Sequence, residues 1–191
     1  MPSDADEVLE GEAVAALAEK NAVSKVRGAA LPAAIMPGAF VLGTDTLVTV
    51  GGRAMGKPGS AGEAAQMLEV LSGRTHQVVS GVALARTVRP SGMVDASPTA
   101  ERGGSVILSE VLVEHAVTDV TFLSLEAADV DAYIASGEWR GKAGAYAVQG
   151  LAGSFVSEIR GEYSNVVGLP LCLLARMFRE SGFDLLRRTW L

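Results

Sequence analysis

An apolar run with one charge in its middle constrains the fold of this chain most. The segment AFVLGTDTLVTV, residues 39–50, has the β-branched and apolar character of a buried strand, and the glycines at 51 and 52 predict a turn after it. Asp45 lies inside the run, where an unpaired ionised carboxylate would cost free energy. Two interpretations stay open: an aspartate capped by local amides at a strand end or bulge, or a metal ligand or general base at a strand's carboxyl end.

The rest of the 191 residues alternates between helical and extended patterns. Apolar spacing predicts helices over 10–26, from Ser60 to Gly73, from Ser124 to Gly137 and over 166–180, and strands over 75–85, 105–122 and 154–163. Interleaved helices and strands indicate the α/β class, with antiparallel hairpins making the twisted sheet mixed. We expect one domain, residues 1–191, with an exposed hairpin loop over 87–104.

Composition excludes several classes of protein. The chain is 49 % hydrophobic and 20 % charged, with a net charge of -6 and no basic stripe, so we expect neither nucleic acid nor a membrane surface as partner. Pro32 and Pro37 interrupt the longest uncharged stretch as a membrane helix. Cys172 is the single cysteine and is predicted to be a buried core thiol, which favours a reducing, cytoplasmic location.

Two further segments carry residues suited to chemistry. Lys57, in a Gly-Lys-Pro turn, is either a solvated turn lysine or a cation that neutralises phosphate oxygens beside Asp45. The segment GEWRGKAGAYAVQG, residues 137–150, is either a structural glycine-rich loop or a ligand-binding loop that presents Lys142 and Gln149. His76 and His115 are not spaced as a metal pair and are predicted to have core or surface roles.

Several motifs, in this order, give the chain a family resemblance: TDT, GKP, EAAQMLEVLSGRTHQVVSG, SGEWRGKAGAYAVQG and SFVSEIRGEYSNVVGLPLCLL. The chain resembles the Maf family of nucleoside triphosphate pyrophosphatases from about Asp4 onward. The resemblance implies two lobes around a nucleotide cleft, hydrolysis of a nucleotide to its monophosphate and pyrophosphate, a divalent metal such as Mg²⁺ or Mn²⁺, and a homodimer.

The resemblance also implies roles for individual residues. Asp45 looks like the proton acceptor and Glu7 like a second metal-binding or basic carboxylate, so both are candidate metal ligands. Lys57 looks like the phosphate-binding lysine, and Lys142 is a further candidate for the phosphates. Thr46 and Gln149 match the specificity positions of the branch that hydrolyses dTTP and UTP, and His76 is similar to that branch too.

Two departures from the family pattern affect the predicted phosphate site. The family begins with a strand and a Ser-x-Ser-Pro-Arg-Arg loop, so this chain is expected to be N-terminally truncated relative to it. The lysine of the family's Leu-Ala-x-x-Lys-Ala pattern falls at Asn21, with Lys20 one position early. Lys20 is therefore the substrate-binding candidate of this helix, although a helix turns by about 100° per residue and a shift of one position can point its side chain elsewhere.

These observations leave two functional hypotheses, beside a third in which the chain is a purely structural dimer module. The first is a pyrophosphatase that acts on dTTP and UTP and attacks the α-phosphorus with a metal-assisted water. The alternative is a catalytically weak or inactive relative that binds a nucleotide or a cell-division partner, because the arginine loop is missing.

Overall fold

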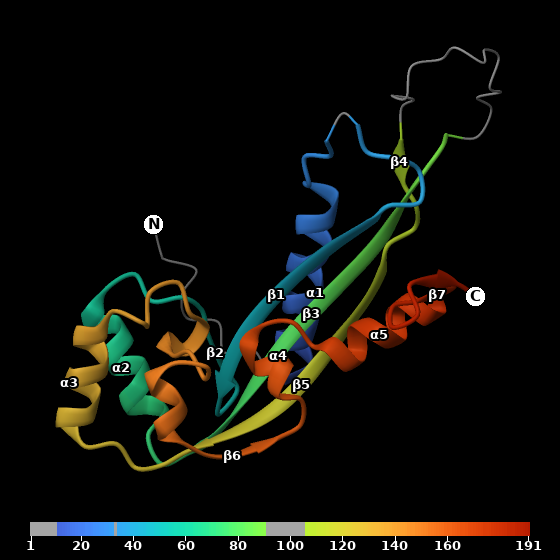
Figure 1. Ribbon diagram of the computed structural model, residues 1–191. Coiled ribbons are helices and arrows are strands. Elements are labelled where there is room, and N and C mark those ends of the chain that lie inside the picture. Colours follow the sequence, from blue (N-terminus) through green and yellow to red (C-terminus); the bar gives the residue numbers. More distant parts are fainter. Residues whose placement is uncertain (1–10, 33, 91–105) are drawn as a thin grey trace.

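A long antiparallel sheet forms the centre of the protein. The computed structural model describes residues 11–32, 34–90 and 106–191, and within them six strands form one sheet in the order β2-β1-β3-β5-β6, with β4 beside β3 (Figure 1). Its strands are β1 (Phe40–Val50), β2 (Arg53–Met55), β3 (Thr75–Val88), β4 (Ile107–Leu108), β5 (Leu112–Phe122) and β6 (Val156–Arg160).

The predicted α/β class, twisted sheet and flanking helices are confirmed, and one detail is corrected. We expected parallel as well as antiparallel neighbours, but every pairing among the described strands is antiparallel. The reason lies in the strand order: a two-glycine turn reverses the chain from β1 to β2, while β2 and β3, which run in the same direction, do not pair because β1 lies between them.

Helices cover the two faces of the sheet differently. They are α1 (Gly11–Arg27), α2 (Ala61–Leu71), α3 (Ala127–Ser136), α4 (Tyr163–Val167) and α5 (Leu171–Glu180), with short 3₁₀ turns η1 (Ala143–Ala145) and η2 (Leu151–Phe155). Figure 1 shows α1 along one face of β1 and β3, whereas α4 and α5 lie across the other. The apolar side of α5 packs there against Val82 and Leu84 of β3.

A second lobe forms at one end of the sheet. There α2, α3 and the two 3₁₀ turns gather around a separate core that includes Leu68, Phe122 and Tyr133 (Figure 1). The predicted two-lobed shape is therefore confirmed. Because β1 and β3 run from one lobe into the other, side chains of both lobes can meet near the middle of β1.

Two glycines bring α1 unusually close to the sheet. A Cβ on Gly81 would lie 2.3 Å from the backbone carbonyl of Ala18, and one on Gly43 would lie 2.5 Å from the carbonyl oxygen of Ala22. The contacting face of α1 is correspondingly small, with Ala18 and Ala22 fully buried beside Val14. Backbone therefore packs almost directly on backbone, which fixes how high α1 sits above β1.

The ends of the other helices follow local signals, with two corrections. Ser60 caps α2 as predicted, because its hydroxyl accepts from the Glu63 backbone N–H. By contrast, α3 is capped by Glu126 and not by Ser124, since Glu126 and Asp129 form a reciprocal capping box. The helix predicted over 166–180 is two helices, because Gly168 adopts a positive φ of 119° between them.

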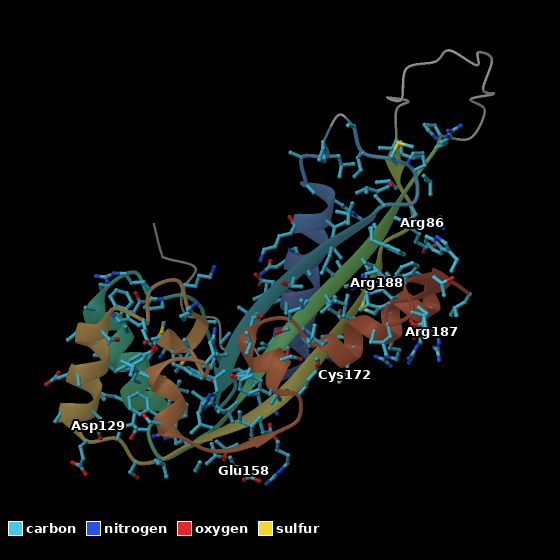
Figure 2. The ribbon with its side chains drawn as sticks, viewed as in Figure 1. Arg86, Asp129, Glu158, Cys172, Arg187 and Arg188 are labelled. Carbon is cyan, nitrogen blue, oxygen red and sulfur yellow. The ribbon has the colours of Figure 1, made fainter. Side chains whose placement is uncertain are left out.

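A small C-terminal hairpin, which was not predicted, packs against the sheet beside Phe40 and Arg86. It consists of β7 (Phe183–Asp184) and β8 (Thr189–Trp190). The guanidinium of Arg86 lies 3.9 Å from the ring centre of Trp190, and Arg86 is drawn beside this hairpin in Figure 2. The sequence signal is weak because each strand has only two residues.

The prediction of a buried thiol was wrong. Cys172 is exposed on the outer side of α5 (Figure 2). The apolar run that contains it is helical, so only the positions that share the inner side are buried, among them Leu173 and Met177.

Other predictions concern the exterior of the protein. No helix among the described residues is long and apolar enough to cross a membrane. Of the predicted hairpin loop over 87–104, positions 91–104 lie outside the described residues, and the rest continues the sheet as far as Val88, which pairs with Ile107.

The close approach of α1 gives a test of this packing. Gly81→Ala should lower the free energy of unfolding by at least about 2 kcal/mol, because the added methyl group meets the backbone of Ala18 and α1 must move. Urea unfolding measures the change. Gly62→Ala in α2 is the matched control: its methyl group would have nothing within 4 Å, and stability should rise by up to about 1 kcal/mol. Equal stability of the two variants would contradict the proposed packing.

Candidate functional site

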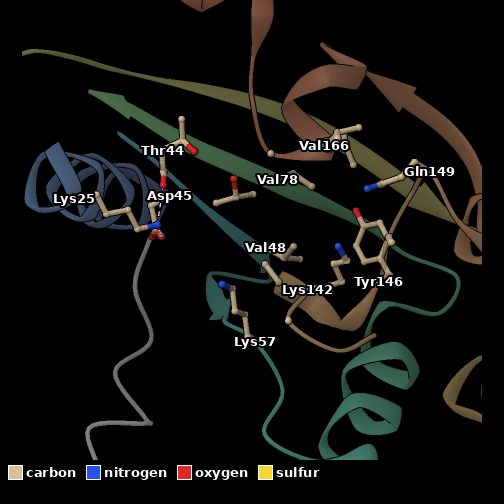
Figure 3. A pocket seen from close by; sticks show the side chains of 16 residues that line it. Lys25, Thr44, Asp45, Val48, Lys57, Val78, Lys142, Tyr146, Gln149 and Val166 are labelled. Carbon is tan, nitrogen blue, oxygen red and sulfur yellow. Dashed lines mark hydrogen bonds and ion pairs between the residues drawn. The ribbon is translucent and has the colours of Figure 1, made fainter. Parts of the chain in front are cut away.

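A pocket of about 240 Å³ lies where the two lobes meet, at the edge of β1 (Figure 3). Over residues 40–47, β1 pairs with β3 on one side, and its described pairing with β2 begins only at Val48. Neighbouring strand residues face opposite sides of a sheet, so Asp45 lies on the α1 side and Thr46 on the α4 side. Both line the pocket, which therefore spans both faces of the open strand edge.

Asp45 is held by two side chains of α1. Its Oδ1 accepts from Lys25 Nζ at 2.6 Å, and its Oδ2 accepts from Asn21 Nδ2 at 2.8 Å. Lys25 Nζ also donates to the carbonyl oxygen of Thr44 at 2.7 Å. Asp45 thus has hydrogen-bond partners, but they are side chains of α1. The interpretation of Asp45 as a residue capped by local amides is therefore not supported.

Three lysines reach the pocket from three parts of the chain. Lys25 comes from α1, Lys57 from the turn after β2, and Lys142 from the loop before η1. Within the described part of the chain, Lys57 and Lys142 make no hydrogen bond or ion pair through their ammonium groups. Together with Asp45, these residues give the pocket an excess of positive charge in an acidic protein.

The opposite side of the pocket is less charged. Figure 3 shows Tyr146, Gln149 and Val166 there, across from Lys25 and Asp45. Tyr146 is buried and Gln149 is exposed, so an aromatic ring and a free amide share this side. An amide carries both donors and an acceptor, which suits the edge of a nucleobase.

A buried hydrogen-bond network supports the wall formed by α4. Asn165 is fully buried, and its Nδ2 donates to the Val78 carbonyl oxygen and to Thr118 Oγ1, both at 3.0 Å. Thr46 Oγ1 lies 2.8 Å from Ser80 Oγ, which in turn donates to the Asn165 carbonyl at 3.5 Å. The network connects α4 to β3 and β5, and through Ser80 it holds the Thr46 hydroxyl in position.

A second buried pair supports Tyr146. Its hydroxyl lies 2.9 Å from His76 Nε2, and the two rings are packed edge to face with Phe122. Burial lowers the pKa of His76 to about 4, with a weaker opposing effect from the Arg74 backbone, and burial raises the pKa of Tyr146. Both groups are neutral near pH 7, so the ring of Tyr146 is held without any charge. The predicted core role of His76 is confirmed.

His115 has the other role that we predicted. It is exposed on β5, where its Nδ1 lies 2.7 Å from Glu19 Oε1 of α1. It lies on the surface and does not line the pocket.

The structure brings together five of the seven predicted site residues: Asp45, Thr46, Lys57, Lys142 and Gln149. Lys20 does not line this pocket and lies instead at a shallow groove beside Arg27. Glu7 falls outside the described residues. Lys25 and Tyr146 were missed, although Lys25 could have been found, since it follows Asn21 by one helical turn.

The donor set of the pocket bears on a divalent metal. No group of three or more His, Cys, Asp or Glu side chains gathers within the described ranges. Mg²⁺ is commonly held by one or two carboxylates together with substrate phosphates, and such a shared site needs no larger protein cluster. Asp45 is the carboxylate that the described lining offers, and it fits this kind of site.

Comparisons with known proteins give the family of the chain. The family model described as Maf-like protein matches residues 1–181. A protein of Rhodopseudomonas palustris (strain HaA2) named dTTP/UTP pyrophosphatase is 41 % identical over 194 aligned positions, covering 100 % of this chain and 84 % of the relative.

Two further relatives carry the same name. That of Bradyrhizobium diazoefficiens is 42 % identical, covering 100 % of this chain and 83 % of the relative. That of Anaeromyxobacter dehalogenans (strain 2CP-C) is 40 % identical, covering 96 % of this chain and 83 % of the relative.

The buried His76 predicts a dependence of stability on pH. The pKa of His76 is about 4 in the folded protein and 6.5 ordinarily, so between these values the unfolded chain binds the extra proton. The folded state should therefore lose up to about 3 kcal/mol as the pH falls from 6.5 to 4. Urea unfolding across this range should show a shallower loss for His76→Gln than for His115→Gln, which removes an exposed histidine. Parallel curves for the two variants would contradict the role of burial.

Proposed function

Because the chain belongs to the Maf-like protein family, we propose that it is a nucleoside triphosphate pyrophosphatase that hydrolyses dTTP and UTP to the monophosphate and pyrophosphate. The observation that carries the proposal is the charge pattern of one pocket. Lys25 pairs with Asp45, the one carboxylate of the described lining, at one end of the pocket, Lys57 and Lys142 line it further along, and the amide of Gln149 lies at the other end (Figure 3). A nucleotide has the same division into a charged and an uncharged end.

The lysine side of the pocket suits the phosphates. Lys57 and Lys142 approach from different loops, and their ammonium groups, which have no partner among the described residues, are available to phosphate oxygens. Cations placed where negative charge grows in a transition state lower its free energy without reorganisation. In this proposal they bind the β- and γ-phosphates and stabilise the departing pyrophosphate.

The opposite side suits the base. Gln149 can present a donor and an acceptor to a pyrimidine edge, and the ring of Tyr146 offers it an apolar surface. The hydroxyl of Thr46 is hydrogen-bonded to Ser80 and lines the same pocket in a fixed position. These contacts would place the α-phosphate between the base and the lysines, close to β1.

Asp45 is the group that this pocket offers as a base. In the proposed reaction the oxygen of a water forms a bond to the α-phosphorus, and the bond from that phosphorus to the bridging oxygen breaks. Pyrophosphate leaves with the bridging oxygen, and the water's proton goes to the carboxylate of Asp45. Asn21 and Lys25 orient that carboxylate, because each donates to one of its two oxygens. Each oxygen keeps a further lone pair that can accept the proton of the water.

A divalent metal, Mg²⁺ or Mn²⁺, belongs to the proposal. Asp45 would hold it, with Glu7 as a second carboxylate on the strength of the family resemblance. When bound, the ion neutralises charge on the phosphate oxygens.

We also propose a setting for the activity. The protein would act in the cytoplasm as a homodimer, with residues 1–191 as one domain. A single exposed cysteine, Cys172, is compatible with a reducing compartment.

Release of pyrophosphate tests the function. The purified protein with Mg²⁺ or Mn²⁺ should hydrolyse dTTP and UTP, and Asp45→Asn should lower kcat at least about 100-fold, because the proton acceptor is lost. Thermal unfolding of the variant should change little, since a partly exposed ion pair is worth about 0.2–1 kcal/mol. If the wild-type protein binds dTTP but releases no more pyrophosphate than the variant, the inactive-relative hypothesis replaces this one.

Gln149 gives a separate test of how the nucleotide lies. Gln149→Ala should raise KM for dTTP about tenfold, because a hydrogen-bonded contact to the base is lost. Inhibition by inorganic tripolyphosphate, which has no base, should not change. Weaker inhibition of the variant by tripolyphosphate would mean that Gln149 binds phosphate and that the assigned orientation is wrong.

A further inference from the structure

Gln149 lies in a short turn whose two flanks are held by side chains from another part of the chain. Resting on the proposed function, we propose that Glu138 is a positioning residue that, together with Tyr133, fixes the place of the Gln149 amide in the pocket and so controls recognition of the base. Gln149 lines the pocket (Figure 3), whereas neither Glu138 nor Tyr133 does. Both would therefore act through Gln149 and not by touching the nucleotide.

The turn that carries Gln149 has little internal support. It is closed by one hydrogen bond, from the Gly150 N–H to the Ala147 carbonyl oxygen at 3.0 Å. Ala147 and Val148 are buried, whereas Gln149 and Gly150 are exposed. Exposed backbone with few hydrogen bonds opens and moves easily. The direction of the Gln149 side chain therefore depends on what holds the backbone on either side of it.

Two side chains hold that backbone symmetrically about Gln149. Two residues before it, the Ala147 N–H donates to the Tyr133 hydroxyl oxygen at 3.1 Å. Two residues after it, the Leu151 N–H donates to Glu138 Oε2 at 2.8 Å. A hydrogen bond to a carboxylate is about twice as strong as one between neutral groups, so Glu138 provides the stronger of the two holds. Glu138 and Tyr133 together form a clamp on the Gln149 turn.

The clamp is built on a rigid part of the second lobe. Tyr133 belongs to α3 and is buried in the core of that lobe. Burial and, more weakly, the nearby charge of Glu138 raise the pKa of Tyr133, so its hydroxyl is neutral near pH 7. Glu138 lies just after α3, beside the buried Trp139, whose indole N–H donates to the Ile134 carbonyl oxygen at 3.1 Å. The core of the lobe thus determines where both ends of the clamp lie.

The fit between Glu138 and Gly150 supports the same assignment. A Cβ on Gly150 would lie 2.1 Å from Glu138 Oε2 and 2.9 Å from the carboxyl carbon. The φ of Gly150 is -112°, which an alanine can adopt, so the backbone conformation does not require glycine here. The absence of a side chain at this position is what lets the carboxylate reach the Leu151 N–H. A methyl group would displace the carboxylate, which is the flexible end of its side chain.

Four variants test the assignment. Glu138→Met removes the acceptor and keeps the length of the side chain, and Gly150→Ala displaces the carboxylate without changing Glu138 itself. Glu138→Gln loses the charge but keeps an oxygen that can accept from the Leu151 N–H. Glu69→Met is the matched control, since it removes an exposed glutamate from α2 of the same lobe.

Kinetics distinguishes a positioning role from a general loss of structure. Glu138→Met and Gly150→Ala should each raise KM for dTTP about five- to tenfold with little change in kcat, because the contact to the base is weakened. Inhibition by inorganic tripolyphosphate, which has no base, should stay as in the wild type. Glu138→Gln should recover most of the loss, and Glu69→Met should behave like the wild type. Thermal unfolding of every variant confirms that it is folded.

A double variant shows whether Glu138 acts through Gln149. Glu138→Met added to Gln149→Ala should raise KM for dTTP no further than Gln149→Ala alone, since a positioning residue has no effect once the group that it positions is gone. If the two single effects multiply instead, Glu138 acts by another route and the inference is overturned.

A measurement without ligand keeps this inference separate from the proposed function. In Glu138→Met, NMR relaxation should give lower order parameters for the Gln149 and Leu151 amides than in the wild type, with faster hydrogen exchange at Leu151. Unchanged amides, or a KM within twofold of the wild type, would overturn the inference. If the wild type hydrolyses no nucleotide, the proposed function fails, and the calorimetric Kd for dTTP then replaces KM. A wild type that does not bind dTTP overturns both.

Discussion

The contact between α1 and the central sheet is the constraint on which the site depends. Gly43 and Gly81 have no side chain on the surface that faces α1, so the backbone of the helix at Ala18 and Ala22 can lie directly over them. At this height, Asn21 and Lys25 reach Asp45 with hydrogen bonds of 2.8 and 2.6 Å. A larger residue at either glycine would lift the helix and separate a carboxylate from the groups that orient it. Packing and function therefore depend on the same two positions.

The open edge of β1 separates the charged side of the pocket, at Asp45, from the uncharged side, at Thr46. Successive residues of a strand face opposite sides of the sheet, and at an open edge both sides remain accessible. Asp45 thus meets the cations of the α1 side, while Thr46 meets Ser80 and the wall of α4 on the other side. Two adjacent residues can in this way serve the phosphate end and the base end of one nucleotide.

Much of this arrangement could be predicted from local sequence, and the errors have physical reasons. The strand around Asp45 and the cap of α2 at Ser60 were confirmed, because β-branched runs and capping patterns act over a few residues. The burial of Cys172 was wrong because an apolar run cannot show by itself which side of a helix faces the core. The purely antiparallel sheet was missed because the relative direction of strands far apart in the sequence is a tertiary property.

The sequence by itself determined which elements form and which residue types are available: a carboxylate inside a strand, a lysine in a glycine-proline turn, and an amide in a glycine-rich loop. Its motifs also carried the family resemblance, which the comparisons confirm. Only the tertiary structure decided which cation meets Asp45. Lys20 and Lys25 lie on the same helix, and the spacing from Asn21 favours Lys25 only once α1 is known to lie over Asp45. The rotation and height of α1 over Gly81 select Lys25, because ion pairs between distant segments depend on distances of a few ångströms that only the packed backbone defines.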